Sequence, residues 1–202
     1  MIMKKILLTI VLALLFGQAF AQRFDASIWG GVNACQIDGD NCGRYGHFGI
    51  HGGVNTSFPL GSNENSPIRM MVELGFTNKG AYEKEANREI SLNYVEIPLI
   101  LTYTMGNIRL GAGVAPGVNV SSKAVYTTGE LDLPTSENYR KMDVLPIVAD
   151  LEYRHNHFLF TIRYENSMLP VSKESGVGTY RVFRSNMGQF SRLVSAGIGY
   201  YF

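Results

Sequence analysis

The sequence has no long uninterrupted hydrophobic segment after its first 21 residues. A membrane-spanning helix needs about 20 consecutive apolar residues. No such helix is therefore expected in the rest of the chain, although 46% of all residues are hydrophobic. The 22 glycines, 11 tyrosines and 11 phenylalanines favour strands over helices. Two classes fit this composition: a secreted β protein and a membrane β-barrel.

A strong charge of either sign is also lacking. The formal net charge is +1 at pH 7, and lysine and arginine form no run. Because nucleic-acid binding usually requires a basic patch, we expect no nucleic-acid partner. The four histidines are not spaced with cysteine or carboxylate residues as zinc ligands are, and no glycine-rich phosphate loop is present. The sequence therefore predicts neither a metal nor a cofactor.

Cysteine is scarce, with only Cys35 and Cys42 in the chain. The two residues flank the polar residues 38–41, and in an oxidising compartment they can form a disulfide across a hairpin tip. Two free thiols are the alternative. A calcium-binding loop starting at Asp38 is disfavoured because its twelfth position is Gly49 rather than glutamate.

The first 21 residues have the features of a targeting segment. Two lysines precede an apolar run at residues 6–16, and residues 19–21 (Ala-Phe-Ala) form a small-residue cleavage motif. The sequence predicts a cleavable signal peptide at residues 1–21, which exports a barrel domain at residues 22–202. No cysteine follows the cleavage motif directly, so a lipoprotein anchor is not expected.

The clearest strand pattern lies in residues 92–103 (LNYVEIPLILTY). Every odd position from Val95 to Tyr103 carries a large apolar side chain, and a strand places alternate residues on one face. Seven further segments alternate in a similar way. The eight predicted strands are residues 24–34, 47–58, 68–77, 92–103, 108–120, 145–153, 158–164 and 194–202.

The connections between these strands alternate between long and short. The short connections are residues 59–67, 104–107 and 154–156, and the longest loops include residues 127–141 and 167–188. Outer-membrane barrels have short turns on the periplasmic rim and long loops on the extracellular rim. A chain that starts and ends on the short-turn rim needs an even number of strands, and eight meets this condition.

Charged residues gather on one face of the predicted strands. An arginine or lysine at the midplane of a lipid-facing surface costs about 2–4 kcal/mol, so a bilayer would enforce this sorting. A soluble barrel would show the inverse, with apolar residues inside. Asp25 shares the charged face. The charge network predicted for the barrel interior comprises Arg69, Glu73, Glu96, Arg109, Asp150, Glu152, Arg163 and Glu165.

The predicted fold class is all-β: an eight-stranded antiparallel up-and-down transmembrane β-barrel after a cleavable signal peptide. Because lipid cannot satisfy an open strand edge, the first strand should pair with the eighth. Tyr103, Tyr153 and Tyr200 fall near the short-turn ends of their strands, where an aromatic girdle is expected.

Three segments resemble the PorT-like outer-membrane β-barrel family of Bacteroidetes: residues 93–103 (NYVEIPLILTY), 110–117 (LGAGVAPG) and 197–202 (GIGYYF). The resemblance covers residues 22–202, and its Y-x-E-I-P-L centre is the most specific part. It implies a multi-pass protein of the bacterial outer membrane, in contact with outer-membrane lipid. Some members are implicated in secretion or cell-envelope assembly, which implies a protein partner in the envelope. The family offers no catalytic residue.

The end of the chain carries a second resemblance. Phe202 follows Tyr200 and further aromatic and apolar residues at every second position. This pattern is similar to the signal that the outer-membrane assembly machinery recognises during insertion.

Three function classes fit the sequence. The first is a structural or accessory barrel whose long loops contact a partner, and the second is a narrow pore, which the packed interior of an eight-stranded barrel disfavours. The third is a lipid-modifying enzyme, which needs a histidine near a serine and a carboxylate. His155 and His157 lie at a short turn, where a polar residue is ordinary. His51 is expected to point inward, towards Ser27 or Asn33, and a hydrogen-bonded interior histidine is favoured over a catalytic one. The sequence favours the first class and predicts no enzymatic activity.

Overall fold

The computed structural model describes residues 24–202 apart from 40–44, 62, 64, 84–87, 127–128, 133–138, 173–178 and 181–186. The predicted signal peptide and Cys42 therefore lie outside the described residues. Within the described part, no helix is long and apolar enough to cross a membrane.

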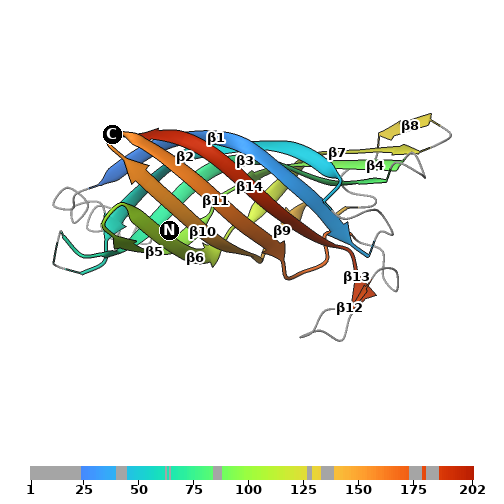
Figure 1. Ribbon diagram of the computed structural model, residues 1–202. Coiled ribbons are helices and arrows are strands. Elements are labelled where there is room, and N and C mark those ends of the chain that lie inside the picture. Colours follow the sequence, from blue (N-terminus) through green and yellow to red (C-terminus); the bar gives the residue numbers. More distant parts are fainter. Residues whose placement is uncertain are drawn as a thin grey trace, which may run out of the picture.

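Eight antiparallel strands close into a barrel (Figure 1). Three of them are interrupted and appear as two collinear pieces. In chain order the barrel strands are β1 (Asp25–Asp38), β2 (His47–Pro59), β3 (Ile68–Glu83), β4 (Arg88–Glu96) with β5 (Leu99–Met105), β6 (Ile108–Val114) with β7 (Gly117–Tyr126), β9 (Met142–Asp143) with β10 (Pro146–His155), β11 (Phe158–Ser167) and β14 (Phe190–Tyr201).

Closure is made by the first and last strands. β1 pairs with β14 from Ser27 opposite Tyr201 to Asp38 opposite Phe190. This pairing leaves no open edge for lipid, as the sequence predicted. The fold class, an eight-stranded antiparallel barrel, is confirmed.

Three prolines interrupt three neighbouring strands at the same level. Pro98 separates β4 from β5, Pro116 separates β6 from β7, and Pro146 begins β10. A proline has no N–H to donate, but each of these prolines accepts a hydrogen bond from the neighbouring strand. The backbone N–H groups of Glu73, Ile97 and Ala115 donate to the carbonyl oxygens of Pro98, Pro116 and Pro146 at 2.9–3.0 Å. The ladder therefore continues through the row of interruptions.

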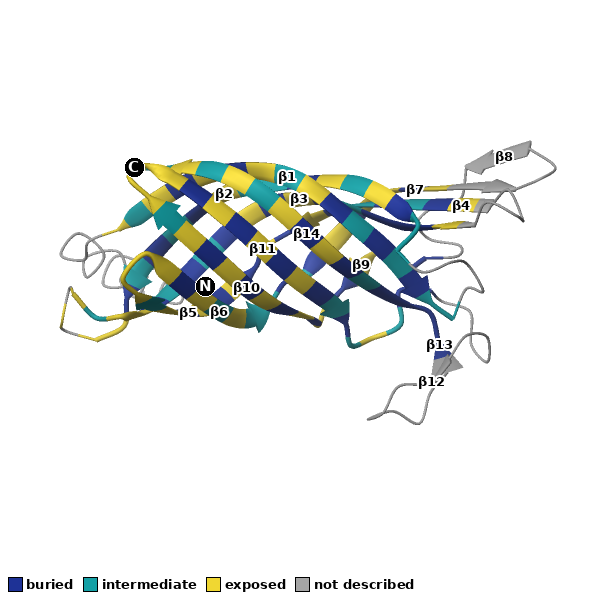
Figure 2. Ribbon diagram, in the orientation of Figure 1, coloured by how far each residue is buried: buried dark blue, intermediate teal, exposed yellow. Residues whose placement is uncertain are grey.

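Buried and exposed residues alternate along the strands of the barrel wall (Figure 2). In β11, for example, Phe158, Phe160 and Ile162 are 49–55% exposed on the outside, whereas Leu159 and Arg163 are buried inside. The ten residues of β11, at about 3.3 Å each and tilted by about 45°, span about 23 Å across the membrane, close to the apolar band of outer-membrane barrels.

The two ends of the barrel differ. At one end, Gly106–Asn107 and Asn156–His157 form two-residue turns, and Gly106 and Asn156 adopt positive φ angles of 58° and 54°. The chain terminus at Phe202 lies at this short-turn end, and the extra strands β8 (Gly129–Asp132), β12 (Thr179–Tyr180) and β13 (Met187–Gly188) lie at the opposite, long-loop end (Figure 1). By the general rule for such barrels, the short-turn end faces the periplasm.

Side chains fill the interior. One apolar cluster consists of Met71, Ile100, Ala115 and Val148, and the Met71 sulfur lies 3.6 Å from a guanidinium nitrogen of Arg109. A second apolar cluster consists of Ile37, Ala81, Ile90, Leu92, Tyr94 and Tyr139, from strand regions toward the long-loop end. An eight-stranded barrel is narrow enough for side chains to occupy its whole cross-section.

Candidate functional site: the charged barrel interior

The central charge cluster is built around Arg163 on β11. Its guanidinium donates to both carboxylate oxygens of Glu73 on β3, at 2.8 and 3.0 Å, and to Asp150 on β10 at 3.0 Å. Thr161 adds a hydrogen bond to Asp150 at 3.1 Å, and the guanidinium lies 5.0 Å from the ring centroid of Trp29. These contacts join three strands across the lumen. The pairing satisfies charges that would be costly if they were buried alone.

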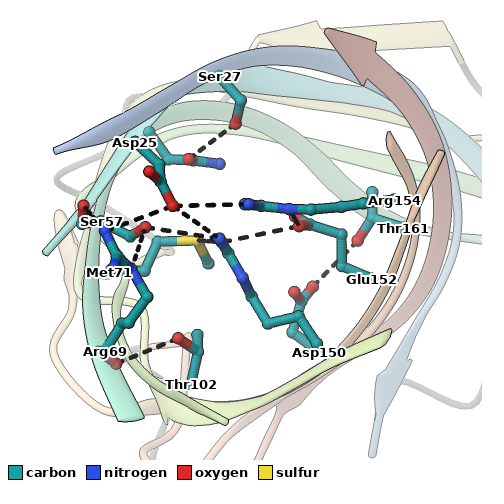
Figure 3. A network of polar contacts seen from close by, with 12 residues as sticks. Asp25, Ser27, Ser57, Arg69, Met71, Thr102, Asp150, Glu152, Arg154 and Thr161 are labelled. Atoms are coloured by element: carbon teal, nitrogen blue, oxygen red, sulfur yellow. Dashed lines mark hydrogen bonds and ion pairs between the residues drawn. The ribbon is translucent and has the colours of Figure 1, made fainter. Parts of the chain in front are cut away.

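A second cluster, the mouth cluster, lies at the short-turn end. It comprises Asp25, Arg69, Glu152 and Arg154, which Figure 3 labels, together with Arg109. One oxygen of Asp25 lies 3.3, 3.9 and 3.7 Å from Arg69, Arg109 and Arg154, respectively. Glu152 lies 3.6 Å from Arg109 and 2.5 Å from Arg154. Three guanidinium groups thus share two carboxylates.

A third cluster lies nearer the long-loop end. The ammonium of Lys79 on β3 is 2.6 Å from Glu96 and also contacts Glu165. The Thr77 hydroxyl donates to Glu96 at 2.7 Å, and the hydroxyl of Ser167 donates to Asp143. The lumen therefore carries charge along its length, with positive charge in excess at the mouth cluster.

The structure places all eight residues of the predicted charge network inside the barrel, where they are 1–8% exposed. It divides them among three clusters rather than joining them in one. Sequence reasoning missed Lys79 and Asp143 and did not include Arg154. Lys79 continues the alternation of β3 beyond the predicted end at residue 77, so a longer strand would have included it. Asp143 could not be found by extending the alternation of its strand. Even-numbered residues face inward from Pro146 onward, but before the interruption the odd-numbered Asp143 faces inward.

The histidines do not assemble a catalytic arrangement among the described residues. His51 points inward, as expected, but its ring packs edge-on against Trp29 at 4.5 Å between centroids. His47 contacts Asn78 at 2.8 Å and Glu89 at 3.5 Å. His157 at the short turn stacks on Tyr200. No three His, Cys, Asp or Glu side chains in the described part of the chain are grouped to hold a metal.

Cys35 lies inside the barrel as a free, fully buried cysteine. Its thiol contacts the side-chain oxygen of Asn33 at 3.2 Å and the backbone oxygen of Asn78 at 3.6 Å. Its proposed partner Cys42 lies outside the described residues, so the disulfide between them stays a prediction.

The outer face of the barrel is apolar. Along β5 and β6, Leu99, Leu101, Ile108 and Leu110 are 43–49% exposed. Tyr103, Tyr153 and Tyr200 project outward near the short-turn end and are 40–47% exposed, which matches the position of an aromatic girdle. Apolar side chains outside and ionic side chains inside define a membrane barrel rather than a soluble one.

The fold and the charged interior together define the class as an eight-stranded transmembrane barrel. The model of the outer membrane protein beta-barrel domain family matches residues 16–172, and the chain belongs to this family. It is accordingly a protein of the bacterial outer membrane.

Two solved structures show the same fold. The attachment invasion locus protein Ail of Yersinia pestis, crystallised with the heparin analogue sucrose octasulfate, has 14% sequence identity and a TM-score of 0.53 over 89% of this chain and 99% of Ail. Neisserial surface protein A has 9% identity and a TM-score of 0.52 over 89% of this chain and 97% of that protein. No curated protein matches the sequence.

Proposed function

We propose that this barrel is a structural or accessory subunit of a cell-envelope secretion or assembly complex, of the PorT-like type found in Bacteroidetes. The observation that carries the proposal is the filled interior. Arg163 ties Glu73 and Asp150 across the lumen, and two clusters of buried apolar side chains occupy further parts of the interior. Contacts with partner proteins are then made by the loops and the outer wall.

The long-loop end offers the surface for such contacts. β3 continues to Glu83, beyond the level at which β2 and β3 pair, and the exposed Tyr82 lies at its end. The short-turn end carries tight turns at Gly106 and Asn156 and the longer β2–β3 connection that follows Pro59. An envelope partner therefore has more protein surface available at the long-loop rim.

Site-specific photo-crosslinking in the native membrane tests this proposal. A photoreactive residue at Tyr82 should give a discrete crosslinked product with another envelope protein, whereas one at Asn107 in the short turn serves as the control. The partner recovered through Tyr82 should also co-purify with the unmodified barrel in mild detergent. Crosslinks of equal strength at both positions, or none at Tyr82, would contradict an accessory role at this rim.

Insertion by the outer-membrane assembly machinery is part of the same proposal. Phe202 is 74% exposed and continues the outward row of Ile198 and Tyr200. The assembly machinery can therefore contact its side chain without displacing other residues. Replacing Phe202 with serine should lower the amount of barrel inserted in cells while leaving refolding of the purified protein into detergent unchanged.

A further inference from the structure

The mouth cluster carries more positive than negative charge. It holds three guanidinium groups, which stay protonated, and only two carboxylates, those of Asp25 and Glu152. The single Asp25 oxygen that contacts all three arginines does so at 3.3–3.9 Å, longer than the 2.7–2.9 Å of a strong charged hydrogen bond. The described side chains of this cluster therefore give the mouth of the barrel a cationic lining.

The cluster is also incompletely hydrogen-bonded. Arg109 is 1% exposed, and its Nε is a buried donor with no hydrogen-bond partner among the residues that the structure describes. The hydroxyl of Thr104, on the adjacent β5, is likewise buried without a partner in the described chain. Buried donors without acceptors are costly, so two of them close together indicate that an acceptor belongs there.

Both groups line the same cavity. A space of about 460 Å³ at the short-turn end is bounded by Asp25, Arg69, Thr104, Arg109 and Arg154, with Asn65, Ser66 and Pro67 of the β2–β3 turn. This volume is within the range of small-molecule sites. Its position at the short-turn rim opens it to the periplasmic side of the membrane.

We propose that this mouth cavity binds a phosphate-class oxyanion from the periplasmic side. The buried Nε of Arg109, the Thr104 hydroxyl and the Arg154 guanidinium present donors that such an anion accepts. Arg69 and Arg109 also donate to Ser57. The anion accepts from the two buried groups that lack a partner in the described part of the chain, Arg109 Nε and the Thr104 hydroxyl, and Asp25 limits its affinity by competing for the same arginines. The ligand is either free phosphate or the phosphate of a phospholipid headgroup at the rim.

Titration of the folded, isotope-labelled protein with inorganic phosphate, at constant ionic strength in a phosphate-free maltoside detergent, tests the site by NMR. The Nε–H signal of Arg109 and the amide signal of Thr104 should shift in a saturable way. Arg154→Gln should weaken the affinity about tenfold or more, and Asp25→Asn should strengthen it. Arg192→Gln, which removes the same charge from an ion pair with Asp38 at the other end of the barrel, should leave the affinity unchanged.

A second arm separates the two sources of phosphate. In phospholipid nanodiscs, a site for free phosphate keeps responding to the titration. A headgroup site shows the Arg109 and Thr104 signals already shifted and unresponsive to added phosphate. Absence of saturable shifts in maltoside for the wild-type protein, or equal losses of affinity in Arg154→Gln and Arg192→Gln, would overturn the proposal. The wild-type titration decides the question even if a variant fails to fold.

Discussion

Arg163 has two carboxylate partners inside the barrel, and neither has access to much water. Glu73 and Asp150 are 3% and 5% exposed, so their charges depend on the guanidinium between them. A buried ion pair contributes little compared with a well-packed apolar replacement, but removing one partner leaves the other charge uncompensated. Arg163 is thus required mainly to compensate the buried negative charges of Glu73 and Asp150.

Replacing Arg163 with methionine should destabilise the barrel by about 3–5 kcal/mol. Urea unfolding of the refolded protein in lipid vesicles measures this change. The control is a triple variant, Arg163→Met with Glu73→Gln and Asp150→Asn, which removes all three charges and should recover most of the loss. Equal stability of the single variant and the wild type would show that the cluster is not held by charge pairing.

Two adjacent glycines of β1 differ sharply in the space around them. A Cβ added at Gly31 would lie 2.1 Å from the backbone oxygen of Ala196 on β14, whereas one at Gly30 would meet nothing closer than 4.0 Å. Gly31 therefore allows the close approach of the two strands that close the barrel.

Gly31→Ala should lower the free energy of unfolding by about 1–3 kcal/mol, because the added methyl group forces the closing strands apart. Gly30→Ala is the matched control and should be neutral or stabilising by less than about 1 kcal/mol. Both are measured by the same urea titration. Equal effects of the two substitutions would contradict the packing at the β1–β14 seam.

At the scale of the strand, the lipid-facing residues of β11 lie at depths from the rim of the membrane to its centre. Ile162 and Phe158 have nearly the same exposure, 55% and 54%, on the same face. Phe158 adjoins the short turn, and Ile162 lies midway along the strand. The two positions therefore differ mainly in depth, and Phe158 also packs edge-on against Tyr200 at 6.2 Å between ring centroids.

Ile162→Arg should cost about 2–4 kcal/mol in a phospholipid bilayer, and Phe158→Arg only about 0–1 kcal/mol, because the cost of an arginine on the lipid face falls toward the interface. Unfolding titrations in vesicles of the two variants give both values. If the cost at residue 162 did not exceed that at residue 158, β11 would not cross the membrane as described.

The alternation of apolar and polar residues was enough to predict all eight barrel strands and, within the predicted ranges, which face of the wall is charged. It failed at strand ends. The third strand continues past residue 77 to Glu83, and the sixth includes Met142–Asp143 before an interruption. β8, β12 and β13 were not expected at all. Proline marks the interruptions in the sequence, but only the pairing of neighbouring strands shows that Pro98, Pro116 and Pro146 lie in one row.

Part of the candidate site could be predicted from the same alternation of apolar and polar residues. Period-two alternation showed which charges face inward, because a bilayer penalises the opposite choice. It could not show which charges meet, since the partners of Arg163 lie 90 residues away on β3 and 13 residues away on β10. Which side chains meet across the lumen is set by the stagger of the closed barrel, and no local sequence pattern reveals that stagger.

For the whole molecule, the filled lumen predicts a barrel that does not conduct. Planar bilayer recordings of the reconstituted protein should show no stable single-channel steps, because apolar clusters and paired charges occupy the cross-section. A variant with Arg109, Glu152 and Arg163 all changed to alanine removes large side chains from two levels and serves as the comparison. Steady wild-type conductance would favour the narrow-pore alternative.

The central claim is that apolar side chains face lipid and the ionic network lies within a closed wall. The single tryptophan of the chain, Trp29, is 6% exposed inside the barrel beside Arg163. Fluorescence quenching by brominated phospholipids tests the claim directly, with Ile162→Trp in a Trp29→Phe background as the outward reporter. We predict strong quenching of the tryptophan at position 162 and weak quenching of Trp29. Stronger quenching of Trp29 than of the residue 162 reporter would contradict the account.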